Sequence, residues 1–130
     1  IYLIIKIYHI YLAKKKNSKQ KITRYWIESE DGLLLCSAAK GSARVAGIYE
    51  LPENLPADLE EVGRDAKPLA TKKRAIGQVD YEEEIFKTKI LENTKNTLPE
   101  GYRWVLWAEL DDLTLSGPHR KWIKELSDET

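Results

Sequence analysis

The sequence predicts an α+β domain in which helices cover a mixed β-sheet. Runs of β-branched and aromatic residues recur along the chain, and Gly, Pro or Asp bounds most of them. Two other segments carry helix-start signals, the first short and acidic, the second amphipathic and close to the C-terminal end. A length of 130 residues fits one such domain.

The first part of the chain differs from the rest in composition. Residues 1–12 are almost entirely apolar, but at a helical rise they are too short to cross a hydrocarbon core of about 30 Å. Residues 13–24 carry basic and no acidic side chains, which is typical of a solvated linker. We therefore expect an apolar segment and a basic linker over residues 1–21, and a folded domain over residues 22–130.

The composition excludes several classes of site. The 21 basic and 21 acidic side chains cancel, so no strong overall field draws the chain to nucleic acid or to a membrane. The single cysteine, Cys36, excludes an internal disulfide and a cysteine-built zinc or iron–sulfur site, and its apolar strand favours an inert buried thiol. The absence of methionine and a start at Ile1 lead us to expect a piece of a longer protein.

The folded part begins with a predicted β-hairpin. Residues 22–30 are rich in β-formers, Asp31 and Gly32 form a typical two-residue turn, and residues 33–36 make the return strand. Residues 48–52 form a further short strand closed by proline.

A short acidic helix follows, over residues 57–62. Pro56 lies at its first turn and Gly63 ends it. We expect a basic loop at 67–74, then strands at 75–79 and 85–91 with the acidic residues 80–84 between them.

The last elements are a strand and a helix. Residues 99–101 form a turn, residues 103–107 are strongly β-prone, and residues 109–113 form one helical turn. The final helix starts at Pro118 after a cap at Ser116 and Gly117. Its buried stripe consists of Trp122, Ile123 and Leu126.

Catalytic side chains are scarce. His9 lies in the apolar segment, and His119 lies in the first turn of a helix, where we expect it to face solvent or a phosphate. No phosphate-binding loop of the Walker or dinucleotide type is present. Carboxylates remain as candidates, because residues 47–63 are rich in them.

This acidic segment resembles the Nudix box. Gly47 and Glu53 fit its first spacing, and the run from Glu60 and Glu61 to Gly63 is similar to its end. The segment is about five residues too short and lacks the Arg-Glu pair of the box. Two interpretations stay open: a divergent Nudix hydrolase that uses Glu53, Glu60 and Glu61 with magnesium on a nucleoside diphosphate derivative, and a solvated acidic helix.

The chain as a whole resembles the C-terminal Nudix-like domain of A/G-specific adenine DNA glycosylases, the MutY family. That domain is an α/β/α sandwich, and the resemblance covers roughly residues 20–126 through segments in the same order. The matching segments are Arg24-Tyr25-Trp26 through Leu35, Ala39-Lys40-Gly41, Ala-Gly-Ile-Tyr-Glu-Leu-Pro at 46–52, Trp104-Val105, Glu-Leu-Asp-Asp-Leu at 109–113 and Leu-Ser-Gly-Pro-His-Arg-Lys at 115–121.

The resemblance implies a role in base-excision repair. A catalytic N-terminal domain, with a helix-hairpin-helix and an iron–sulfur cluster, excises adenine opposite 8-oxoguanine, and the Nudix-like domain checks the oxidised base. The parent protein would then be a hydrolase of N-glycosidic bonds in the bacterial cytosol or nucleoid. This chain would carry no catalytic residue, no cofactor and no metal, and its partners would be that catalytic domain and mispaired double-stranded DNA, with no membrane.

The family's base-sensing loop maps onto Ile76, Gly77 and Gln78, where the family has Phe-Ser/Thr-His. Ile76 provides an apolar wedge, Gly77 only backbone, and Gln78 a hydrogen-bonding group for a base edge. An ordinary strand end is the alternative interpretation.

Basic residues near this loop are candidate phosphate contacts. They are Lys40 with Gly41, and Lys72, Lys73 and Arg74. DNA binding there requires the acidic run 82–84 to face away. A solvated basic loop, or a protein-interaction module with no nucleic-acid role, are the alternatives.

Overall fold

The structure is a computed structural model, and it describes residues 18–37, 47–91 and 98–128. The apolar segment 1–12 and the candidates Lys40 and Gly41 lie outside the described residues. No helix of the described part is long and apolar enough to span a membrane.

The centre of the fold is a six-stranded mixed sheet with the order β3-β2-β1-β5-β4, in which β6 pairs with β2. β1 and β5 run parallel over their whole lengths, from Ser18 opposite Val79 to Glu28 opposite Lys89, and the other pairs are antiparallel. The strands are β1 (Ser18–Glu28), β2 (Gly32–Ser37), β3 (Tyr49–Glu50), β4 (Lys67–Ile76), β5 (Val79–Lys89) and β6 (Tyr102–Leu106).

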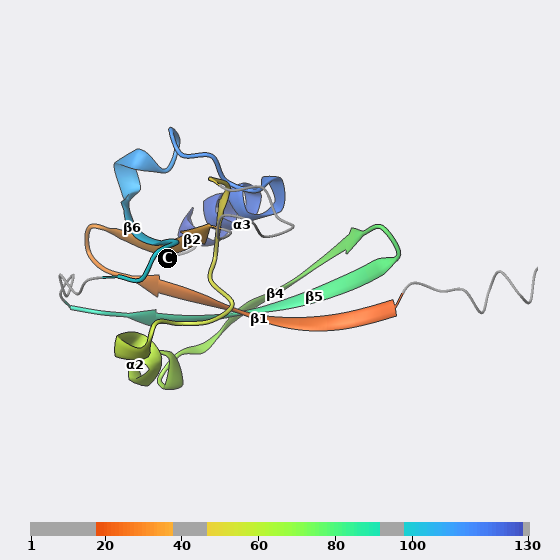
Figure 1. The fold of residues 1–130 in the computed structure, drawn as a ribbon, viewed down its shortest axis with the longest axis horizontal. Helices are drawn as coiled ribbons and strands as arrows, with labels where there is room; N and C mark the ends of the chain where they lie inside the picture. Colours follow the sequence, from red (N-terminus) through yellow and green to blue (C-terminus); the bar gives the residue numbers. More distant parts are fainter. Residues whose placement is uncertain (1–17, 38–46, 92–97, 129–130) are drawn as a thin grey trace, which may run out of the picture.

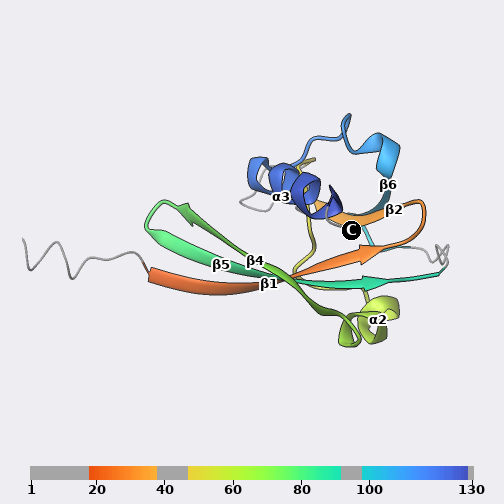
Figure 2. The same ribbon diagram turned by 180° about the vertical axis from the view of Figure 1, so that it is seen from behind.

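Helices lie on opposite sides of this sheet (Figures 1 and 2). On one side is α2 (Glu60–Arg64), preceded by the 3₁₀ turn η1 (Ala57–Leu59). On the other side is α3 (Gly117–Asp128), which follows the 3₁₀ turn η2 (Trp107–Glu109). The predicted layering of helices on a mixed sheet is therefore confirmed.

Two apolar layers hold the sheet between its helices. Because alternate strand residues point to opposite faces, Trp26 packs toward α3 while Ile27 packs toward α2. The predicted helix stripe is confirmed, since Trp122, Ile123 and Leu126 of α3 are all buried. Each such side chain contributes about 1.5–3 kcal/mol through its burial.

The predicted first hairpin is present, but its glycine acts differently from our expectation. The loop consists of residues 29–31, and Gly32 is already the first residue of β2. A Cβ on Gly32 would lie 2.1 Å from the carbonyl oxygen of Val105. The glycine is required for the close approach of β6, and not for a turn with positive φ.

The structure of the middle of the chain differs from three expectations. Residues 67–74 are strand β4 and not a loop, and residues 80–84 lie within the uninterrupted strand β5. The expected strand 75–79 is interrupted, because Gly77 and Gln78 form the turn that joins the end of β4 to the start of β5 at Val79. The physical reason is the backbone ladder between β4 and β5, which sets the basic residues Lys72 and Lys73 across from acidic residues of β5.

Three local boundaries also differ from the prediction. Residues 18–21 belong to β1 and not to a linker, because β5 pairs with them. Gly63 lies inside α2 and does not end it. Its lack of a side chain allows Leu55 to pack closely, because a Cβ there would meet Leu55 Cδ1 at 2.5 Å. The helical turn expected at 109–113 is the 3₁₀ turn η2, which starts two residues earlier. Cys36 is half-buried and not fully buried.

Candidate functional site

The tip of the β4–β5 hairpin presents the three residues predicted to sense a base. Ile76 is 53% exposed although it is a large apolar side chain. Gly77 adopts φ 59°, a left-handed conformation that favours glycine. The carbonyl of Gln78 accepts a hydrogen bond of 3.0 Å from the backbone of Ser18, which ties the turn to the start of β1.

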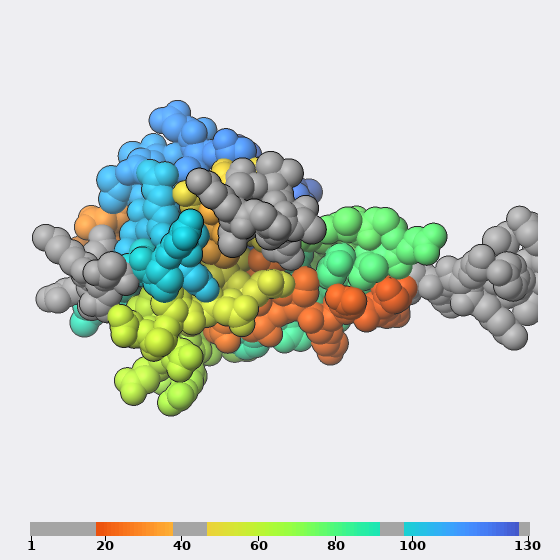
Figure 3. Space-filling model, in the orientation of Figure 1, coloured from red at the N-terminus to blue at the C-terminus, as the bar shows by residue number. Residues whose placement is uncertain are grey.

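This tip lies at the free end of the sheet. Figure 3 shows β1, β4 and β5 projecting together from the body of the molecule. The two helices lie over the other parts of the sheet (Figure 1). The arrangement exposes the tip on a support of three hydrogen-bonded strands.

The three basic residues before the tip have different surroundings. Lys72 donates a hydrogen bond of 3.0 Å to Glu125 of α3, and this bond lowers the pKa of that carboxyl. Arg74 pairs with the buried Glu83, Nε to Oε2 at 2.7 Å, and its guanidinium lies 5.6 Å from the Trp122 ring centroid. Lys73 points to the opposite face of the sheet, because strand side chains alternate. Of the three, only Lys73 is exposed.

A buried charge cluster lies between the sheet and α3, centred on Arg24. Its Nε donates a hydrogen bond of 2.8 Å to Glu83, and both side chains are fully buried. Its Nη1 donates a bond of 2.7 Å to the carbonyl of Leu51 and lies 3.4 Å from Glu50. Glu53, at 4.0 Å from Nη2, lies at the rim of the same cluster. Arg24 therefore joins β1 and β5 to the segment after β3.

His119 completes this cluster, which corrects the expectation that it faces solvent or a phosphate. It is fully buried, and its Nδ1 accepts a hydrogen bond of 3.0 Å from the backbone N–H of Leu51. The imidazole is thus neutral, with its proton on Nε2. That Nε2 lies 3.7 Å from Glu83 and 3.8 Å from Glu50.

The cluster shifts two ionisation equilibria. Burial opposes ionisation of Glu83, but nearby His119 and the charges of Arg24 and Arg74 outweigh it, and the pKa of Glu83 lies below its ordinary value of 4.5. Burial also lowers the pKa of His119 below 6.5, helped by the Arg24 charge and opposed by the carboxylates. Glu83 is consequently ionised and His119 neutral at pH 7.

The position of Glu83 corrects a further expectation. Of the acidic run 82–84, which was expected to face away from the basic residues, Glu83 points inward and binds two arginines. The inward position of Glu83 could have been predicted from the alternation of side chains along β5, since Glu83 shares a face with the buried Ile85. Arg24 was not singled out as a functional residue because its partner lies 59 residues away.

The acidic residues of the alternative hydrolase site are only partly brought together. Glu53 and Glu60 line a cavity of about 380 Å³ beside α2, together with Arg64, and Glu61 is not among its lining residues. No group of three or more His, Cys, Asp or Glu suited to a metal ion occurs in ranges 18–37, 47–91 and 98–128.

Comparison with known proteins relates this geometry to a fold. No family profile and no curated protein matches the chain. Among solved structures, the C-terminal domain of mouse MUTYH in complex with human PCNA has a TM-score of 0.63 at 18% identity, over 84% of this chain and 88% of that one.

Two further solved structures are similar. A MutT protein from Methanosarcina mazei has a TM-score of 0.62 at 16% identity, covering 87% of this chain and 96% of that one. The NUDIX domain of Shewanella oneidensis NrtR, solved with ADP ribose, has a TM-score of 0.62 at 12% identity, over 93% and 96% of the two chains. The chain has a Nudix-like α+β fold.

Removing the buried carboxylate should destabilise the domain strongly. Glu83→Gln removes the fully buried counter-charge of the Arg24 guanidinium, so we expect a loss of about 3–5 kcal/mol in the free energy of unfolding. Glu125→Gln is the matched control, because the same substitution there breaks an exposed ion pair with Lys72. It should change the free energy of unfolding by less than about 1 kcal/mol. Denaturant unfolding measures both, and equal losses would contradict the role of the cluster.

Acid should weaken the fold in two steps. Because the folded-state pKa of His119 lies below 6.5, the unfolded chain takes up more protons as pH falls through 6.5, and stability drops. The contribution of Glu83 is present above 4.5 and is lost below it. His119→Asn, whose amide oxygen replaces Nδ1 as acceptor, should flatten only the first step in unfolding curves recorded between pH 8 and 3. An unchanged first step would contradict a buried neutral imidazole.

Proposed function

We propose that this chain is the lesion-recognition domain of an A/G-specific adenine DNA glycosylase in base-excision repair. It is itself non-catalytic, and it helps to recognise 8-oxoguanine opposite adenine. A catalytic domain elsewhere in the same protein, with an iron–sulfur cluster, excises the adenine, and both act on mispaired double-stranded DNA in the cytosol or nucleoid. The order of the matching sequence segments supports this assignment.

The observation that carries the proposal is the exposed β4–β5 tip. A large apolar side chain, Ile76, projects beside the open backbone of Gly77 and the amide of Gln78 at the free end of the sheet. An apolar residue of this kind acts as a wedge at a base step, and an amide reads base edges through hydrogen bonds. The tip thus combines a probe for base stacking with a probe for base identity.

The buried charge cluster supports a non-catalytic role. A Nudix hydrolase needs free carboxylates that converge on a divalent cation. Here the Arg24 guanidinium lies among Glu50, Glu53 and Glu83 and neutralises part of that acidic set. The fold shared with the mouse MUTYH domain agrees with this role, at 18% identity.

The tip should set the preference of the intact glycosylase for its lesion. We expect faster adenine excision opposite 8-oxoguanine than opposite guanine, and a several-fold narrower ratio in Gln78→Ala, since one base-edge contact is worth about 1–3 kcal/mol. Asn54→Ala is the matched control, because it removes an exposed side-chain amide from the loop before α2, outside the end of the sheet that carries the tip. Single-turnover excision rates on the two mispairs measure this ratio. Equal rates in the unaltered enzyme would contradict the proposal.

A second candidate is a divergent Nudix hydrolase, favoured by the cavity that Glu53, Glu60 and Arg64 line. It predicts magnesium-dependent release of pyrophosphate or phosphate from a panel of nucleoside diphosphate derivatives. Glu60→Gln would abolish that release, whereas Glu61→Gln, outside the cavity, would retain it. Turnover that depends on Glu60 would favour this function over lesion recognition, and no turnover on any substrate would remove it.

A further inference from the structure

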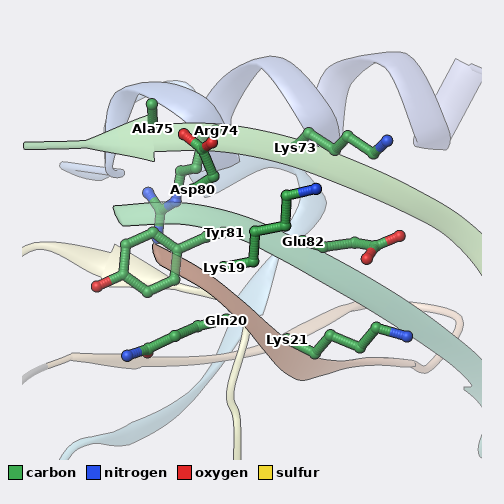
Figure 4. Close-up of a pocket in the computed structure, with 9 residues that line it drawn as sticks. All are labelled: Lys19, Gln20, Lys21, Lys73, Arg74, Ala75, Asp80, Tyr81 and Glu82. Carbon is green, nitrogen blue, oxygen red and sulfur yellow. The ribbon is translucent and has the colours of Figure 1, made fainter. Parts of the chain in front are cut away.

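A groove of about 650 Å³ lies beside the tip, on the projecting end of the sheet (Figure 4). Strands β1, β5 and β4 form it side by side. Its lining includes three lysines, Lys19 and Lys21 from β1 and Lys73 from β4. The sequence predicts a linker over these residues and so does not single out Lys19 or Lys21, which the structure places in β1.

The strand register places these lysines on one face. Lys21 and Lys73 both lie opposite Glu82 of the central strand β5, one on either side of it. In the next row toward the tip, Lys19 lies opposite Asp80. Because residues two apart on a strand share a face, all three lysines point the same way. The cations thus stand on the outer strands, and the carboxylates stand between them on the central strand.

These lysines are available for a ligand. All three side chains are exposed, and no described carboxylate forms an ion pair with any of them. Arg74 is different, because its side chain points to the α3 face and binds Glu83. With three ammonium groups against two carboxylates, the groove keeps an excess of positive charge although the chain as a whole is neutral.

We propose that this groove, through Lys19, Lys21 and Lys73, holds the phosphodiester backbone of duplex DNA while the tip contacts the bases. This inference rests on the proposed function. Lys19 lies opposite Asp80, two residues from Gln78, which corresponds to about 7 Å along the strand. The groove therefore lies within reach of a duplex that meets the tip end-on. A phosphodiester backbone matches this set of lysines, because it repeats a negative charge along its length and lysine side chains neutralise such phosphates.

The two surfaces then have separate tasks. Lysine offers a flexible point charge and no planar hydrogen-bonding fork, so it contacts phosphates without reading base identity. The groove supplies affinity that falls with salt, and the tip supplies discrimination between lesions. A change in the lysines should alter binding to all duplexes by the same factor.

Binding of the chain to short duplexes over a range of salt concentrations tests the separation. The duplexes hold adenine opposite either 8-oxoguanine or guanine, and fluorescence anisotropy reports the affinity. Each phosphate contact contributes about 0.9 to the slope of log K against log salt, so replacing all three lysines by alanine should reduce the slope by about 2 to 3. Affinity at low salt should fall at least tenfold for both duplexes alike. The same three positions changed to glutamine should behave in the same way, and thermal melting verifies that both variants fold.

The matched control removes three exposed lysines elsewhere, Lys89, Lys121 and Lys124, and so makes the same change in net charge. It should retain most of the slope and the affinity. An equal loss in the control, no loss in the groove variants, or no salt-dependent binding by the unaltered chain would overturn the groove assignment. Tighter binding of poly-glutamate than of duplex would overturn it as well.

Failure of the groove is distinguishable from failure of the proposed function. If the groove variants bind the duplexes with unchanged affinity while the intact enzyme still prefers the oxidised mispair, only the groove assignment is wrong. If the groove variants lose affinity for DNA but adenine is excised from both mispairs at equal rates, the lesion-recognition role is wrong and the DNA-binding groove is retained.

Discussion

The ion pair between Arg24 and Glu83 connects β1 and β5 with β4 and with the segment after β3. Both side chains are fully buried, so each needs the other as a counter-charge. Arg24 also holds the carbonyl of Leu51, while His119 of α3 accepts the N–H of that residue. The backbone of Leu51, just after β3, is thereby bound by a side chain of the sheet and by a side chain of α3. The same guanidinium also lies 4.0 Å from Glu53, one of the three carboxylates of the alternative hydrolase site.

The cluster also lies between two structurally different ends of the sheet. At one end, α2 and α3 cover apolar layers on both faces, and packing there uses Trp26 and Ile27. At the other end, β1, β4 and β5 continue beyond the helices, held to each other by a parallel and an antiparallel ladder. Their exposed tip and lysine groove are supported by the pairing of Arg74 with Glu83, which secures β4 against β5 and α3. These paired strands thus support the surface that we propose for recognition.

Sequence reasoning located the elements whose signals are local. The first hairpin, the β6 strand and the buried stripe of α3 follow from β-propensity, turn residues and helical spacing over a few residues. It missed β4 and the first half of β5, since a basic run and an acidic run each look solvated until the two lie opposite one another in a sheet. The inward turn of Glu83 depends on Arg24, 59 residues away, and the roles of Lys19 and Lys21 depend on β1 starting at Ser18. The structure of these residues depends on contacts between distant parts of the chain, and not on residue type alone.

The most direct measurement for the central claim is a map of the DNA contact surface on the folded chain. Backbone amide spectra recorded by NMR during titration with a duplex that holds 8-oxoguanine opposite adenine provide it residue by residue. We expect the largest shifts at Gly77, Gln78 and the lysine groove, with the α2 cavity unchanged. Shifts confined to Glu53, Glu60 and Arg64, or elicited there by a nucleoside diphosphate with magnesium and not by the duplex, would contradict the account.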